Sequence, residues 1–157
     1  MIKKSLFTGL LLFLFIIFPI SAANVSLLIM ETGLPSGNRA NQYSLMLENA
    51  ILDAFYNTGH IVSNAPIMKL PIIPEGVFPN EAERDFKYAE NGGMDYFLIA
   101  IADYSKTPNN VSLRLFKIKS KEVIGEKVFL RSMSNNTKED NEIINKAVLS
   151  MLQEIKF

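Results

Sequence analysis

The sequence predicts an α/β fold: a three-layer sandwich with a mixed sheet of about five strands, in the order β-α-β-α-β-β-β-α, and helices on both faces. Three observations predict it. The seven apolar residues Tyr96–Ala102 follow a Gly-Gly pair and show no alternation, as in a strand that is buried on both faces. Helical and strand patterns alternate before this run, which predicts parallel pairing with right-handed crossovers. After it, apolar and polar residues alternate, which is typical of a hairpin with one solvated face.

The first part of the predicted domain contains a strand, a helix and a short strand. Asn24–Glu31 is a mostly apolar run that indicates a largely buried strand. We expect a helix from about Asn38 or Asn41 to Asn57, because its apolar residues recur on one helical face. Gly59 is placed to take the left-handed conformation that ends a helix. His60–Ser63 is then expected to form a short strand.

The stretch Asn64–Asn80 contains four prolines with apolar residues between them. Because proline cannot donate to a strand ladder, the stretch is not a central strand. We expect a long surface loop or an edge segment that lies over the core. Long loops are often functional, and the alternative is an insertion that only shields a sheet edge. Its apolar residues form the candidate partner surface: Ile67, Leu70, Ile72, Ile73, Val77 and Phe78.

The second part is expected to hold a short helix, the central strand, a hairpin and a last helix. Asn80–Glu90 begins with Asn80 and Glu83 at the spacing of a capping box. In the hairpin, the alternation changes phase between Leu115 and Phe116, which predicts a β-bulge. The returning strand is Val123–Arg131. The last helix is amphipathic and begins near Thr137, with Asp140 at capping-box spacing.

Residues 1–23 have the pattern of a signal peptide. Lys3 and Lys4 precede the apolar block Leu6–Phe18, and Ser21-Ala22-Ala23 offers small residues before a cleavage point. The block has 13 residues, whereas a membrane-spanning helix needs about 20. We therefore expect an exported, periplasmic protein with a leader cleaved after about Ala23 and a single domain over 24–157. The alternative is a leader that is kept as a membrane anchor.

Composition and charge exclude several classes of protein. The chain has 157 residues, of which 48% are hydrophobic and 20% charged, as in a globular protein. Without Lys3 and Lys4, 14 basic residues face 16 acidic ones, which gives no basic footprint for nucleic acid or anionic lipid. The sequence contains no cysteine. Disulfides, thiol catalysis, cysteine metal sites and the lipidated cysteine of bacterial lipoproteins are therefore excluded.

Four segments together resemble a group of bacterial envelope proteins. They are NVSLLIMET, LMLENAILDAFYNTGHIV, YAENGGMDYFLIAIADY and NVSLRLFKIKSKEVIGEKVF. In their order and pattern they are similar to the TolB amino-terminal domain, the curli-secretion protein CsgG and LpoB, the periplasmic activator of penicillin-binding proteins. The resemblance covers nearly all of 24–157 and implies an envelope-located module of protein–protein interaction. It carries over no binding residue, because no chemical motif anchors it.

The chain also departs from these families. CsgG and LpoB are lipoproteins, and this sequence has no cysteine to lipidate. TolB has a propeller after the similar domain, and CsgG builds its pore from long membrane-crossing hairpins. No segment of this sequence is long enough for such a hairpin.

A candidate ligand site follows from the predicted topology. In open α/β sheets, ligands bind beyond the carboxyl ends of the strands. Glu31, Thr32 and Gly33 follow the first strand, and Asp103 and Tyr104 follow the central one. If the two strands are neighbours, two carboxylates approach each other, as a cation site or an acid/base site requires. The alternative is that both are strand-end acids that face water.

Other chemistry is not indicated. The loop Gly33–Gly37 lacks the Lys-Ser/Thr of a P-loop and the third glycine of a dinucleotide fingerprint. His60 is the only histidine, and no nucleophile motif accompanies it. We therefore expect no catalytic residue, cofactor or metal. The predicted function is a non-catalytic binding or accessory module whose partner is another envelope protein. The alternative is a small-ligand-binding protein or a hydrolase that uses Glu31 and Asp103.

Overall fold

The structure is a computed structural model that describes residues 22–33, 41–131 and 137–155. Its elements in chain order are β1 (Asn24–Thr32), α2 (Gln42–Asn57), β2 (Ile61–Asn64), β3 (Met68–Lys69), the 3₁₀ turn η1 (Asn80–Ala82), α3 (Glu83–Asn91), β4 (Tyr96–Asp103), β5 (Asn109–Lys117), β6 (Glu122–Arg131) and α4 (Thr137–Gln153). Of the predicted leader, only Ala22 and Ala23 lie within these residues, so cleavage stays a prediction.

The strands form one mixed sheet in the order β2-β1-β4-β5-β6, and the two-residue β3 also pairs with β1. The strands β2, β3 and β4 all pair with β1 in parallel, whereas β5 and β6 are antiparallel additions. This confirms the predicted fold class and places Tyr96–Asp103 in the middle of the sheet. The sixth strand, β3, arises where the proline-punctuated stretch briefly follows the edge of β1.

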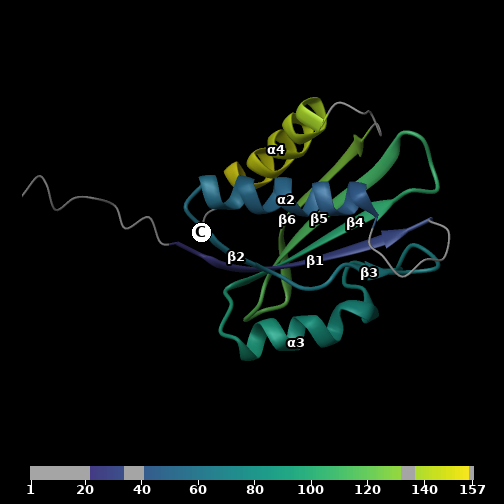
Figure 1. The fold of residues 1–157 in the computed structure, drawn as a ribbon. Coiled ribbons are helices and arrows are strands. Elements are labelled where there is room, and N and C mark those ends of the chain that lie inside the picture. The colour runs from purple at the N-terminus through teal and green to yellow at the C-terminus, as the bar shows by residue number, and fades with distance from the viewer. Residues whose placement is uncertain (1–21, 34–40, 132–136, 156–157) are drawn as a thin grey trace, which may run out of the picture.

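Helices cover both faces of the sheet (Figure 1). On one face, α2 and α4 enclose a core with alternate side chains of β1, β4 and β5. On the other face, α3 and residues from the 65–78 segment enclose a second core. Because β4 contributes Leu98 and Ala100 to the first core and Phe97 and Ile99 to the second, it is an unbroken apolar run.

The ends of α2 follow local rules. The side chain of Asn41 accepts a hydrogen bond from the Tyr43 N–H at 2.8 Å and so caps the first turn. After the helix, Gly59 has a φ of +84°, and the His60 N–H donates to the Phe55 carbonyl. The left-handed glycine predicted after this helix is therefore confirmed.

The predicted capping box at Asn80 is wrong. A 3₁₀ turn precedes α3, and no side-chain hydrogen bond caps either element. The carboxylate of Glu83 instead accepts a hydrogen bond from Lys121 Nζ at 2.6 Å. Lys121 belongs to the turn of the β5–β6 hairpin, and its ammonium lies 3.9 Å from the ring centre of Phe78. The carboxylate predicted to cap the helix thus binds Lys121, which is distant in the sequence.

The hairpin has the predicted irregularity, because the β5–β6 register shifts between Leu115 and Phe116. At its far end, Arg131 is fully buried and forms an ion pair with Asp140 of α4. Arg131 also donates from Nη1 to the carbonyl oxygen of Tyr43, at 2.6 Å. One guanidinium therefore joins β6, α4 and α2.

Candidate functional site

The predicted ligand-site residues come together at the carboxyl ends of β1 and β4. The two strands are parallel neighbours, with Glu31 opposite Ala102 and Thr32 opposite Asp103. The pairing on which the predicted site depends is therefore present. Glu31, Thr32, Asp103 and Tyr104 are all buried, so they are not the water-facing acids of the alternative interpretation.

Asp103 is held by its neighbours on the α3 side of the sheet. Its Oδ1 accepts hydrogen bonds from the Ser105 N–H at 2.9 Å, the Ser105 hydroxyl at 2.5 Å and the Thr32 hydroxyl at 3.5 Å. Burial raises the pKa of Asp103, but the hydrogen bonds from Ser105 and Thr32 and the charge of Lys106 lower the pKa overall. The carboxylate is therefore ionised. Its Oδ2 is buried with no hydrogen-bond partner in the described part of the chain.

Glu31 points to the opposite face. Its Oε2 accepts the Asn41 N–H at 3.2 Å, where α2 begins, and Lys69 Nζ lies 3.6 Å from its Oε1. Successive residues of a strand point to opposite faces, so Glu31 and Asp103 approach from different sides of the sheet. A two-carboxylate ligand site at this edge stays a prediction. Each acid already has a structural role, Glu31 at the start of α2 and Asp103 in the turn after β4.

Gly33 and Tyr104 complete the predicted set. Gly33 has a φ of +76°, and a Cβ atom there would lie 2.4 Å from the Ser105 nitrogen. Only glycine allows the two strand ends to approach this closely. The Tyr104 N–H donates to the Thr32 carbonyl at 3.0 Å, and its hydroxyl is hydrogen-bonded to the buried Ser44 hydroxyl of α2 at 2.8 Å. Because Tyr104 is buried, its pKa is raised.

The candidate partner surface divides into an anchored part and an exposed part. Ile67, Leu70 and Phe78 are half-buried and pack against the two cores. In contrast, Ile72, Ile73 and Val77 are exposed by 71%, 47% and 62%. The sequence could not separate these groups, because both consist of large apolar residues between prolines.

The exposed part is held from both sides. Pro74 and Pro79 are buried, and the ring of Phe78 lies edge-on to Phe116 with ring centres 5.2 Å apart. From β5, Arg114 Nη1 donates to the carbonyl oxygens of Gly76 and Val77, at 2.9 and 3.1 Å. The segment is thus fixed to the sheet while its outer apolar side chains face solvent.

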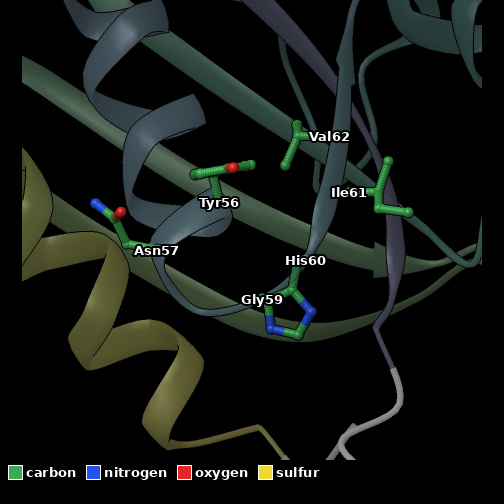
Figure 2. Close-up of a pocket in the computed structure, with 6 residues that line it drawn as sticks. All are labelled: Tyr56, Asn57, Gly59, His60, Ile61 and Val62. Carbon is green, nitrogen blue, oxygen red and sulfur yellow. The ribbon is translucent and has the colours of Figure 1, made fainter.

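A pocket of about 630 Å³ lies at the other end of the molecule, and the sequence did not point to it (Figure 2). It is lined by the end of α2 (Tyr56 and Asn57), by Gly59 and His60, and by the start of β2 (Ile61 and Val62). The His60 Nδ1 accepts the Ala23 N–H at 3.3 Å, and burial lowers the pKa of this histidine. The residues of the pocket are mainly apolar or neutral, and none is a nucleophile paired with a base.

The described residues contain no cluster of three or more His, Asp or Glu side chains that could hold a metal ion. None of the helices in these residues has the length and hydrophobicity of a membrane-spanning segment.

Three solved bacterial structures are similar to the chain. TolB from Acinetobacter baumannii matches with a TM-score of 0.50 and 11% identity, over 88% of this chain and 30% of TolB. The LpoB C-terminal domain from Escherichia coli has a TM-score of 0.48 and 17% identity, over 73% and 87% of the two chains. A PelC dodecamer from Paraburkholderia phytofirmans has a TM-score of 0.49 and 11% identity, over 85% and 86%.

The match to TolB shows a shared fold and confirms that part of the predicted resemblance. A shared fold does not imply a shared function. The resemblance to CsgG stays a prediction. No curated protein matches the sequence. A family model matches residues 35–153, most of the chain, and the chain belongs to this family, which is described as "Uncharacterised protein".

Proposed function

We propose that the protein is a non-catalytic accessory module of the bacterial cell envelope that binds another envelope protein. The observation that carries this proposal is the apolar tip, defined as Ile72, Ile73 and Val77. These three large apolar side chains are exposed on a segment that buried prolines and Arg114 hold against the sheet. The three residues lie within the segment 72–77, and exposed apolar residues close to one another are typical of interaction sites.

A fixed apolar surface is suited to binding. A segment that is already ordered loses little conformational entropy when a partner docks, so more of the contact energy appears as affinity. The predicted signal peptide and the fold shared with TolB support an envelope location. The strand-end acids support the non-catalytic role, because Asp103 and Glu31 hold a turn and a helix start.

Site-specific photocrosslinking in the native cells tests the proposal. A photoreactive amino acid is placed at Ile73 or Val77 of the full chain, and crosslinked products are identified by mass spectrometry. The matched control is Leu45 of α2, which is also an exposed apolar residue but lies on the other side of the sheet. We expect one envelope protein to crosslink at Ile73 and Val77 and not at Leu45. The same product at all three positions, or none at any, would contradict the proposal.

Binding strength provides the second test. The identified partner is purified, and its affinity for the wild-type chain is compared with that for Ile72→Lys/Val77→Lys. Because both side chains are exposed, the variant is expected to fold normally and to bind at least about tenfold more weakly, which corresponds to about 1.4 kcal/mol. Leu45→Lys is expected to bind as wild type does. An unchanged affinity of the tip variant would place the partner elsewhere.

A further inference from the structure

The outer edge of the sheet at β6 is the feature that the proposed function does not use. Among the described residues, β6 pairs only with β5, so its other edge presents unpaired backbone N–H and C=O groups. At ten residues, it is much longer than the opposite edge strand β2, which has four. Long open edges are templates for pairing with another strand.

Only one half of β6 is regular enough to pair. The first half faces the register shift at Leu115/Phe116 of β5 and contains Gly125, which lies under Met151 of α4 and Ile155 just after this helix. From Glu126 to Arg131, each residue has one partner on β5 in unbroken order. A bulge normally protects an edge, so the second half is the part left open.

Charged side chains also protect edges in many proteins, but those in the second half of β6 are already paired within the chain. Arg114 Nε contacts Glu126 at 2.8 Å, and Lys127 Nζ lies 3.8 Å from Glu154 of α4. Arg131 is buried against Asp140. The charges of this half therefore lie along the two faces of the sheet, with partners, rather than guarding the edge.

Two apolar side chains remain exposed on the same half. Val128 and Leu130 are exposed by 57% and 62%. They lie opposite Ser112 and Asn110 of β5, on the face away from α4, whereas Phe129 between them packs into the core under α4. Exposed apolar residues two apart on an open strand are the pattern expected where a further strand adds to the sheet.

We propose that β6 binds β6 of a second copy of this chain, and that the two sheets join into one. Two identical strands pair antiparallel about a two-fold axis perpendicular to the sheet, which keeps the same face of both copies on the same side. With the axis at Phe129, Val128 of each copy lies opposite Leu130 of the other. The strand is thus self-complementary. Lys127 comes opposite Arg131 of the second copy, but both cations already have carboxylate partners in their own chain.

The oligomeric state of the chain recovered from cells tests the proposal. Sedimentation equilibrium over a hundredfold range of concentration is expected to show a monomer–dimer equilibrium. Val128→Lys/Leu130→Lys places four like charges at the axis, so we expect its dissociation constant to rise at least tenfold. The matched control, Ile72→Lys/Ile73→Lys, replaces two exposed residues of the apolar tip and is expected to dimerise as wild type does. A monomer at every concentration, or a dimer that the β6 variant leaves intact, would overturn the proposal.

The register can be tested with disulfides, because the chain has no cysteine of its own. Val128→Cys and Leu130→Cys are made in separate chains and oxidised alone or mixed. In the proposed register the two cysteines face each other, within the distance that a disulfide spans. A crosslinked dimer is expected in the mixture and not with either variant alone. Crosslinking of the separate variants, or none in the mixture, would overturn the register about Phe129.

Discussion

Arg131 and Asp140 form an ion pair that is closed to solvent, with 0% and 2% of the side chains exposed. The guanidinium Nε contacts both carboxylate oxygens, at 2.7 and 2.8 Å. Two charges this deep in the protein are stable only as a pair, because each alone loses its hydration. The ion pair therefore fixes the position of the start of α4 relative to the end of β6.

Removing one member of this pair is expected to destabilise the fold strongly. Asp140→Asn leaves the guanidinium buried without its counter-charge, and we expect a loss of about 3–5 kcal/mol in the free energy of unfolding. Urea denaturation followed by circular dichroism measures it. The control is Glu126→Gln, which breaks the exposed pair with Arg114 and is expected to cost about 0–1 kcal/mol. Similar losses in the two variants would show that the buried pair is not a main contact.

Substitution of two glycines with positive φ can distinguish the cost of backbone strain from the cost of steric crowding. Gly59→Ala meets no atom within 4 Å, so it is expected to cost only the left-handed strain of about 1–2 kcal/mol. Gly33→Ala adds a Cβ at 2.4 Å from the Ser105 nitrogen and must also push the turn after β4 away. We expect it to cost clearly more than Gly59→Ala in the same urea experiment. Equal losses of stability in the two variants would mean that the turn after β4 moves aside without cost.

The single histidine is expected to make stability depend on pH. Burial lowers the pKa of His60 from 6.5 in the folded protein, so on acidification the unfolded chain binds the proton first. The stability contributed by neutral His60 is full above about pH 6.5 and is lost as the pH falls through the lower folded-state pKa. Urea titrations at pH 8 and pH 5, with His60→Phe as the control, measure this slope. The His60→Phe variant is expected to lose this pH dependence of stability. If the pH dependence persists in the variant, the carboxylates cause it.

Asp103 is expected to respond to acid in a lower range. The pKa of Asp103 is lowered in the folded state. The ionised carboxylate therefore contributes to folding stability above the unfolded-state pKa of about 3.9. This contribution is lost as the pH falls through the folded-state pKa. Asp103→Asn keeps the shape but gives up charge-assisted hydrogen bonds from Ser105 and is expected to cost about 1.5–3 kcal/mol at pH 7. The exposed Glu90→Gln is the control. A stabilising effect of Asp103→Asn would instead indicate an acid kept for a ligand at a cost in stability.

The two parts of the proline-punctuated segment are expected to behave differently on substitution. Phe78→Ala removes edge-on contacts with Phe86 and Phe116 and the ring beneath Lys121, and should cost about 2–4 kcal/mol. Ile72→Ser, on the apolar tip, should change stability by no more than about 0.5 kcal/mol. Thermal unfolding of the two variants against wild type checks both values. A large loss for Ile72→Ser would mean that the tip supports the fold rather than a partner.

The fold could be predicted because its signals are local in the sequence. The apolar run Tyr96–Ala102, the helical face of α2 and the glycine at 59 each depend on neighbouring residues. The phase change at Leu115 and Phe116 even gave the position of the bulge. Apolar residues recur along the sequence with the period of the helix or strand, so the pattern indicates both the type of element and its buried face.

Contacts between distant residues could not be predicted. Arg131 was expected to end a hairpin strand, but its guanidinium binds the Tyr43 carbonyl, 88 residues earlier. Glu83 has the spacing of a capping residue, yet its carboxylate accepts a hydrogen bond from Lys121 of the hairpin. At the candidate ligand site, the sequence placed Glu31 and Asp103 at the same sheet edge but could not place them on opposite faces. The register that decides the face is set by strand pairing.

The position of β1 has a consequence for how the chain folds while it is being synthesised. This strand is the first of the described strands to leave the ribosome, yet all its partners, β2, β3 and β4, come later in the chain. The sheet can close around it only when residue 103 has emerged. Until then, its apolar side chains have no sheet to enter and are open to chaperones or to aggregation. The slow step in making this protein is therefore expected to be the docking of β4, and a chain cut before that strand should not fold.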